Sequence, residues 1–297
     1  MHAAVRAAHQ GCRLLNTMKQ VVVGVDAAWT PSGSSGFAVA ELDGNNARLI
    51  LAAPSYAAFG VGAEKQEVNW LKPKRIPLDV DAVLEMISDV SGQRPDLVAV
   101  DMPLSRQPIS GRRTADNCIS RAFGAAWAGT LSPSKERPGA YGRRLQTKLE
   151  EQGYVLQTKR CEARRKELIE VYPHTALIRL LNEPRRLTYK VAKRRKYWPE
   201  LSVEQRTHHL EEVWTRIADG LNDVLPGSGQ WISDARAHCT SMKAVEDVID
   251  AIVSAWVGIC FLRGAIEPPY GDDDAAIWVP CAMSMEEKTV GRKRNGS

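Results

Sequence analysis

Residues 21–26 form the sequence feature that most limits how this chain can fold. They read Val-Val-Val-Gly-Val-Asp, a short β-branched run that ends in a carboxylate and is followed by a loop rich in glycine and serine. Such a short apolar run is typical of a central strand that is buried on both faces. We therefore expect Asp26 to lie where a buried strand emerges from the core.

A second stretch, residues 96–101, has the same pattern. It reads Asp-Leu-Val-Ala-Val-Asp and is soon followed by Pro103, and proline cannot continue a central strand. A helical pattern over residues 80–90 separates the two strands, so a crossover can place them side by side and parallel. Asp26 and Asp101 are then expected at the same carboxyl edge of the sheet, where open α/β sheets bind ligands.

The remaining periodic segments predict an α/β fold with a mixed five-stranded sheet flanked by helices. Three strands form an antiparallel meander that contains an Asp-Gly-Asn-Asn hairpin signal, and the later strands are parallel. The predicted strands are residues 21–26, 37–42, 47–53, 96–101 and 166–172. The predicted long helices are residues 80–90, 203–225 and 242–263, with a shorter helix from residue 174 to residue 181.

We expect a single domain over residues 18–281, because no linker or internal repeat divides the chain of 297 residues. Helical insertions into this domain are expected near residues 105–160 and 183–240. Residues 1–17 are basic, lack acids and precede a second methionine, which predicts a disordered extension. Residues 282–297 are polar and basic, which predicts a flexible tail.

The composition limits the class of protein without identifying it. The net charge of +5 is compatible with an anionic partner, but basic charge often serves solubility alone. Six scattered cysteines form no Cys-x-x-Cys pair, so neither a zinc site nor a disulfide framework is expected. A reducing cytoplasm is the expected compartment, and no segment is long and apolar enough to predict a membrane span. The oligomeric state is left open.

The predicted helix at residues 242–263 carries the most information about function. One narrow face at helical spacing carries two acids and then only small residues: Asp247, Asp250, Ala251, Ser254 and Gly258. Small residues let a helix lie close against another element, so the two aspartates are expected to face inward at its start. The alternative is that both acids favour the N-terminal half of the helix only through the helix dipole.

Five carboxylates could therefore meet at one edge of the sheet: Asp26, Asp101, Glu170, Asp247 and Asp250. Singly, each has a structural explanation, such as an Asx turn at a strand end or a charge on an edge strand. Carboxylates held together repel one another and take up protons unless a cation neutralises them. Oxygen ligands without histidine or cysteine favour Mg²⁺ or Mn²⁺, and such ions can activate water for phosphodiester hydrolysis.

The order of elements resembles the RNase H-like superfamily, in which acids lie on the first strand, the fourth strand and the last helix. Residues 247–251, Asp-Val-Ile-Asp-Ala, resemble the corresponding helix of the RuvC resolvase branch. The chain is more similar to domain of unknown function 429, a family described as predicted RNase H-like nucleases. Six stretches within residues 19–280 carry this resemblance: residues 24–26, 100–104, Arg113 with Asp116, residues 170–174, Tyr189 with Lys190, and residues 247–251.

This resemblance implies an RNase H-like fold and a metal-dependent nuclease that uses Mg²⁺ or Mn²⁺. The catalytic and metal-binding residues that it implies are Asp26, Asp101, Asp247 and Asp250. The residues that it implies in support of these ligands or in substrate binding are Glu170, Arg113, Asp116, His174, Tyr189 and Lys190. The strand that carries Glu170 holds no ligand in RNase H-like enzymes, so Glu170 is either a support for the ligands or a ligand itself.

Nucleic acid is the partner that a nuclease needs, and residues 185–196 are its expected contact. This stretch is rich in arginine and lysine and contains Tyr189, with Tyr197 and Trp198 just beyond it. A solvated basic helix is the alternative. Two other functions remain open: nucleotide-phosphate binding, as in the actin and sugar-kinase branch, and a non-catalytic RNase H-like binding module that keeps the acids for stability.

Overall fold

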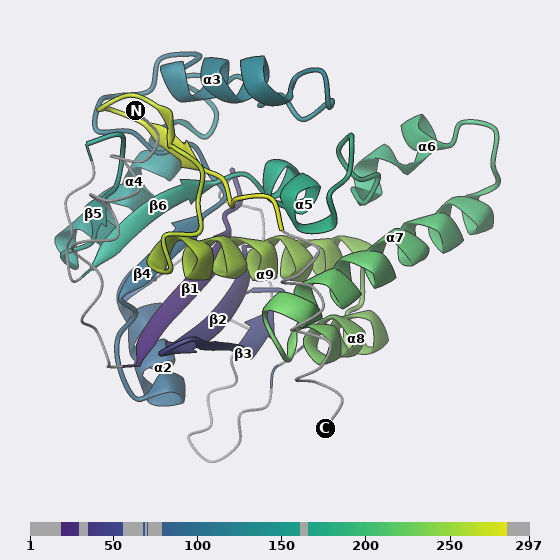
Figure 1. Ribbon diagram of the computed structural model, residues 1–297, viewed down its shortest axis with the longest axis horizontal. Helices are drawn as coiled ribbons and strands as arrows, with labels where there is room; N and C mark the ends of the chain where they lie inside the picture. The colour runs from purple at the N-terminus through teal and green to yellow at the C-terminus, as the bar shows by residue number, and fades with distance from the viewer. Residues whose placement is uncertain are drawn as a thin grey trace.

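Strand β1 (Gln20–Asp26) lies in the middle of a mixed sheet (Figure 1). It pairs antiparallel with β2 (Gly36–Asp43), which pairs antiparallel with β3 (Asn46–Ala53). On its other side β1 pairs parallel with β4 (Leu97–Val100), and β4 pairs parallel with β6 (Glu167–Val171). The antiparallel meander and the parallel placement of the two aspartate-ended strands therefore agree with the sequence prediction.

The computed structural model describes residues 19–29, 35–55, 68, 70, 79–160 and 166–283. The predicted extension at residues 1–17 lies outside this part of the chain. So do most of the predicted tail and most of the Gly/Ser-rich loop after Asp26. None of the helices in the described ranges is both long and apolar enough to cross a membrane.

The sheet continues beyond β6, so the prediction of five strands was wrong: the described residues form eight. Strand β5 (Val155–Leu156) pairs with the start of β6, and β8 (Ala276–Trp278) pairs with its end. Strand β7 (Tyr270–Gly271) then pairs antiparallel with β8. These additions are only two or three residues long, which is too short for an alternating pattern to be recognised in a sequence.

The helices that were predicted individually form close to their expected bounds. They are α2 (Val80–Ser91), α5 (Pro173–Leu181), α7 (Val203–Val224) and α9 (Met242–Leu262). The two stretches predicted as helical insertions contain α3 (Thr114–Phe123), α4 (Gly139–Glu151), a 3₁₀ turn η2 (Val191–Lys193), α6 (Arg194–Tyr197) and α8 (Ser228–His238).

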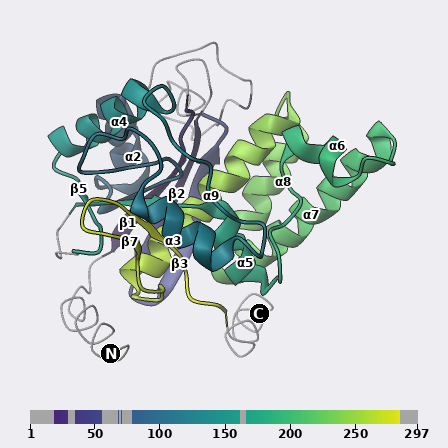
Figure 2. The same cartoon turned by 90° about the horizontal axis from the view of Figure 1, so that it is seen from above.

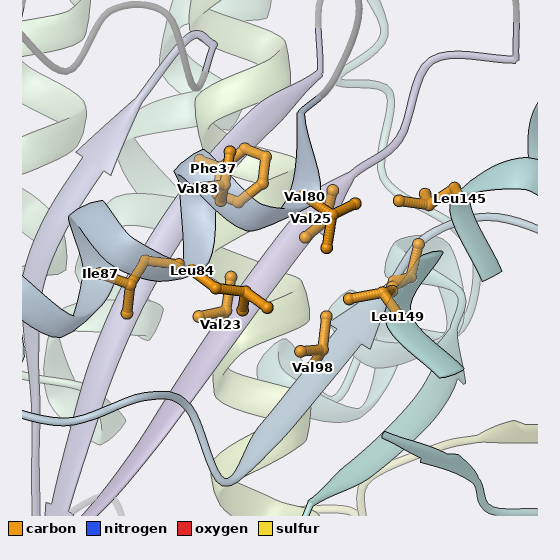
Figure 3. A pocket seen from close by; sticks show the side chains of 11 residues that line it. Val23, Val25, Phe37, Val80, Val83, Leu84, Ile87, Val98, Leu145 and Leu149 are labelled. Carbon is orange, nitrogen blue, oxygen red and sulfur yellow. The ribbon is translucent and has the colours of Figure 1, made fainter. Parts of the chain in front are cut away.

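Apolar layers cover both faces of the sheet because side chains of successive strand residues point to opposite sides. Val23 and Val25 of β1 pack with α2 and α4 around a small apolar cavity of about 20 Å³ (Figure 3). Val22 faces the opposite side, where it packs in one core with α9. Helices α7 and α8 extend this second core beside α9 (Figure 2). The carboxyl edge of the sheet is therefore fixed between two packed layers.

Helix α9 approaches β1 so closely that a side chain at Gly24 has no room. A Cβ atom there would lie 2.1 Å from the backbone oxygen of Ala251 and 2.3 Å from the backbone nitrogen of Ala255. Gly258 repeats the arrangement from the helix side, where a Cβ atom would lie 2.4 Å from Val22. The small residues on the narrow face of the helix thus serve close packing against the strand, as predicted.

We expect Gly24→Ala to destabilise the protein strongly, because its methyl group would meet helix backbone rather than a movable side chain. Overpacking of this kind costs about 1–3 kcal/mol or more in the free energy of unfolding. Gly111→Ala is the matched control, since no atom of the described residues lies within 4 Å of a Cβ atom at that position. Urea unfolding checks both variants, and equal midpoints for the two would contradict the close contact.

Candidate functional site

Asp26 and Asp101 lie beside each other at the carboxyl edge of the sheet. Asp26 is the last residue of β1, and Asp101 directly follows β4. The backbone N–H of Asp101 donates to the oxygen of Val25 at 2.8 Å, which continues the parallel pairing to the strand ends. The structure thus brings together the two aspartates that the sequence predicts at one edge.

The first turns of α9 place three more acids at this edge. Glu246, Asp247 and Asp250 are buried, with at most 3% of each residue exposed. A Cβ atom at Gly36, the residue that pairs with Asp26, would lie only 2.1 Å from the backbone oxygen of Asp247. The acids of α9 therefore face the strand ends and not solvent, which excludes the helix dipole as their only role.

This crowding changes the proton affinity of the strand-end aspartates. Burial raises the pKa of Asp26 well above its ordinary value, and the nearby Asp250 and Asp247 raise it further. Burial and Asp250 likewise raise the pKa of Asp101 to about 7. Within the described ranges, no hydrogen-bond donor reaches either carboxylate. Asp26 and Asp101 thus take up protons more readily than ordinary aspartates, because their surroundings compensate a negative charge there only in part.

Two lysines compensate the acids of α9. Lys190 binds Asp250 and lies 3.5 Å from Glu246, and the hydroxyl of Tyr189 donates to the other oxygen of Asp250 at 2.6 Å. Lys243 binds Asp247 and lies 2.8 Å from Glu246. Burial disfavours the Glu246 carboxylate, yet the two lysine charges lower its pKa below the ordinary value.

Sequence reasoning missed Lys243 and Glu246 as parts of this cluster. Their signal is the spacing of Lys243 to Glu246 and Asp247, three and four positions along one helix. The same spacing is common on solvated helix faces. Only the close packing of α9, which buries both acids, makes it part of a site.

The donor set fits a hard divalent cation in its chemistry, since Asp26 and Asp101 supply carboxylate oxygens that lack a full counter-charge. Within the ranges that the structure describes, however, no group of three or more His, Cys, Asp or Glu side chains is arranged as a metal site. Asp247 and Asp250 are instead held by Lys243 and Lys190. A metal ion could therefore use the strand-end aspartates directly and an acid of α9 only by exchange with its lysine.

Glu170, Arg113 and Asp116 form a separate, fully paired network. Arg113 donates from both terminal nitrogens to the two oxygens of Glu170, at 2.6 and 2.7 Å, and binds Asp116 at 2.8 Å. The backbone N–H of Leu104 also donates to Glu170 at 2.7 Å. This network joins β6, α3 and the loop after Asp101. In this arrangement Glu170 supports the position of Asp101 through that loop.

His174 lies near the start of α5 with its ring between two tyrosines. The ring centroids of Tyr172 and Tyr189 are 5.4 and 5.2 Å from that of His174. Burial lowers the pKa of His174 well below its ordinary value, and the charges of Lys190 and Arg186 lower it further. Its Nδ1 atom is buried and has no hydrogen-bond partner among the residues that the structure describes. The imidazole is therefore neutral near pH 7.

One cleft of about 560 Å³ contains most of these groups. Nine of the ten residues predicted for the site line it: Asp26, Asp101, Arg113, Asp116, Glu170, His174, Tyr189, Lys190 and Asp247. Asp250, the tenth, is fully buried and held by Tyr189 and Lys190. The basic residues Arg186 and Lys193 lie on the same wall as His174, and Leu131 lies on the lining as well.

We expect Arg113→Met to lower the free energy of unfolding by about 3–5 kcal/mol, because it leaves the buried Glu170 without its counter-charge. Adding Glu170→Gln removes that charge and should recover part of the loss. Arg121→Met, on the exposed surface of the same helix, is the matched control. Urea unfolding of the variants checks this. A loss no larger than that of the control would contradict the role of the network.

The comparisons with known proteins identify the family. Residues 24–275 match the family model described as "Protein of unknown function (DUF429)". No curated protein and no solved structure matches the chain. The matched range includes the strand-end aspartates, the Arg113 network, both lysines and the acids of α9. Since the match covers more than half of its length, the chain belongs to the DUF429 family.

Proposed function

We propose that this protein is a metal-dependent nuclease, which hydrolyses phosphodiester bonds of nucleic acid with Mg²⁺ or Mn²⁺ at the carboxyl edge of the sheet. The observation that carries the proposal is the pair Asp26 and Asp101. Both lie in a large cleft, and both have raised pKa values because they are buried and because neighbouring acids add negative charge. A bound Mg²⁺ or Mn²⁺ ion would neutralise the two carboxylates.

We also propose that the central strands belong to the RNase H-like class. Support comes from the strand order β3-β2-β1-β4-β6, with the three antiparallel strands on one side and the parallel strands on the other. Further support comes from the positions of the acids, at the end of β1, just after β4 and on the last long helix. In this proposal β5, β7 and β8 are additions at the outer edge of β6.

Asp26 and Asp101 would hold the metal ion, together with Asp247 or Asp250 once a lysine is exchanged. The bound ion supplies a Lewis acid that activates water and stabilises the leaving oxygen. Lys190 and Lys243 bring positive charge next to the acids, where they can attract a phosphate group. The neutral imidazole of His174, which lines the same cleft, can accept a hydrogen bond there.

The basic stretch at residues 185–196 supports nucleic acid as the substrate. Arg186, Lys190 and Lys193 line the cleft, and no ion pair to an acid involves Arg186 or Lys193 among the described residues. Partial burial lowers the pKa of Lys193, and the charges of Arg186 and Lys196 lower it further. The stretch is a loop followed by the 3₁₀ turn η2 and the single turn of α6, and its residues Lys193, Arg195 and Lys196 are exposed. The alternative, a solvated basic helix without a ligand, is separated from a nucleic-acid contact by the salt dependence of binding.

The second candidate is a non-catalytic nucleic-acid-binding module of the same fold. The specific observation in its favour is that Lys190 and Lys243 already neutralise Asp250 and Asp247. Nucleotide-phosphate binding depended on the Gly/Ser-rich loop after Asp26, most of which lies outside the described residues. The response of the acids to a metal ion separates the two candidates.

We expect Asp26→Asn to abolish most of the stabilisation that Mn²⁺ gives the protein. At about 100 times its Kd, a bound ion stabilises a native protein by about 2.7 kcal/mol. Without metal, the variant should be as stable as the wild type or more so, because one repelling charge is removed. Thermal melts in EDTA and in Mn²⁺ measure both effects.

Asp43→Asn is the matched control, because Asp43 ends β2 on the exposed surface. The Asp43→Asn variant should be stabilised by Mn²⁺ as much as the wild type is. A wild type that gains nothing from Mn²⁺ would favour the binding module over the nuclease. An Asp26→Asn variant that melts lower in EDTA yet gains as much from Mn²⁺ as the wild type would show that Asp26 is structural.

We expect the protein to bind nucleic acid with a steep dependence on salt, because phosphate contacts release counterions, and a labelled single strand is the probe. Replacing Arg186, Arg195 and Lys196 by alanine should reduce the slope of log K against log salt by roughly 2, at about 0.7 for each lost contact. Fluorescence anisotropy between about 50 and 200 mM salt measures the slope. Alanine at the exposed Arg94, Arg121 and Arg144 is the matched control. Equal slopes for the two triple variants would exclude the basic stretch as the contact.

A further inference from the structure

Two large apolar side chains are exposed on the loop between α3 and α4. Trp127 has 59% of its surface exposed and Leu131 has 71%. The other large hydrophobic residues exposed in the described chain, Val155 and Val203, lie alone on separate elements. Leu131 lines the cleft that contains Asp26, and Trp127 precedes it by four positions on the same loop.

Hydrogen bonds fix the backbone of the loop that carries Trp127. Trp127 has a φ of 61°, a conformation that a bulky residue adopts only where its surroundings enforce it. Its N–H donates to Gly124 at 2.9 Å, and the N–H of Arg186 donates to Ala126 at 2.9 Å. The hydroxyl of Tyr172 donates to Gly129 at 3.1 Å. The exposed ring is therefore presented by an ordered loop.

A positive charge accompanies the ring. The guanidinium carbon of Arg185 lies 4.3 Å from the ring centroid of Trp127, which is cation–π geometry. Arg185 has no acidic partner among the residues that the structure describes. Arg186, next in the chain, lines the cleft. The surroundings of the exposed ring are thus basic, which favours an anionic ligand over an apolar protein surface.

We propose that Trp127, Leu131 and Arg185 form a stacking platform for an unpaired nucleobase of single-stranded nucleic acid that enters the cleft. An aromatic face beside a cation binds a base of any identity, while nearby arginines bind the strand phosphates. Bases inside a duplex are stacked on each other and cannot use such a platform. This inference rests on the proposed function and adds to it the substrate class, single strands or strand ends.

The test measures binding in EDTA with the Asp26→Asn variant as background, so that no strand is cut. The probes are labelled single strands of about 12 nucleotides, one of DNA and one of RNA, the DNA duplex of the same sequence, and a fully abasic DNA strand of equal length. Trp127→Ala should weaken binding of the base-containing strand roughly tenfold and leave the abasic strand unchanged. Trp127→Phe should restore most of the binding, and Val203→Ser is the exposed apolar control.

The outcomes separate the platform from the proposed function. Loss of the preference for bases over abasic strand in Trp127→Ala supports the platform, and the DNA and RNA arms show which sugar the cleft accepts. Equal binding of the single strand by Trp127→Ala and the background protein would overturn the platform but leave the nuclease proposal intact. Tighter binding of the duplex than of the single strand would also overturn the platform. Failure of the background protein to bind any probe at low salt would overturn the platform and the nucleic-acid substrate together.

Discussion

The contact between α9 and β1 is the constraint on which the rest of the structure depends. Gly24 has no side chain, and the facing turns of α9 carry only alanine at the closest positions, so helix backbone lies against strand backbone. The N-terminal part of the helix lies beside the end of β1 and the start of β2, because the backbone of Asp247 lies against Gly36. Close packing of apolar and small residues thus forces charged residues together. Without it the acids of α9 would lie farther from Asp26.

The acids of this cluster are not all neutralised to the same extent. Lys190 and Lys243 bind the acids of α9, whereas no side chain in the described ranges forms an ion pair with Asp26 or Asp101. A cluster kept only for stability would be expected to pair each carboxylate, as Arg113 pairs Glu170 and Asp116. Both patterns occur in the same cleft. The contrast between the paired network and the partly compensated aspartates is therefore the electrostatic argument for a functional cation.

Local patterns predicted the central strands and the edge at which the aspartates meet, because Val-rich runs and small-residue helix faces carry their own periodicity. The outer strands β5, β7 and β8 were missed, since two or three residues become strands only through pairing along the edge of the sheet. Glu170 and Arg113 are 57 positions apart, and only the family resemblance linked them. Trp127 carries no sequence signal at all, because its exposure depends on how the loop is held by Arg186 and Tyr172.

The two lysines also differ in how readily they could give way to a metal ion. Both lysines contact Glu246 as well, but the Lys190 side chain is only 20% exposed and lies 4.8 Å from the ring centroid of Tyr189. The Lys243 side chain is 50% exposed, so water can receive its charge when it leaves Asp247. Displacing Lys190 would leave a largely buried cation without its partner, which costs far more than moving an exposed one. On the proposed mechanism, we therefore infer that Asp247 joins Asp26 and Asp101 around the ion, while Asp250 remains bound to Lys190 and Tyr189 beneath them.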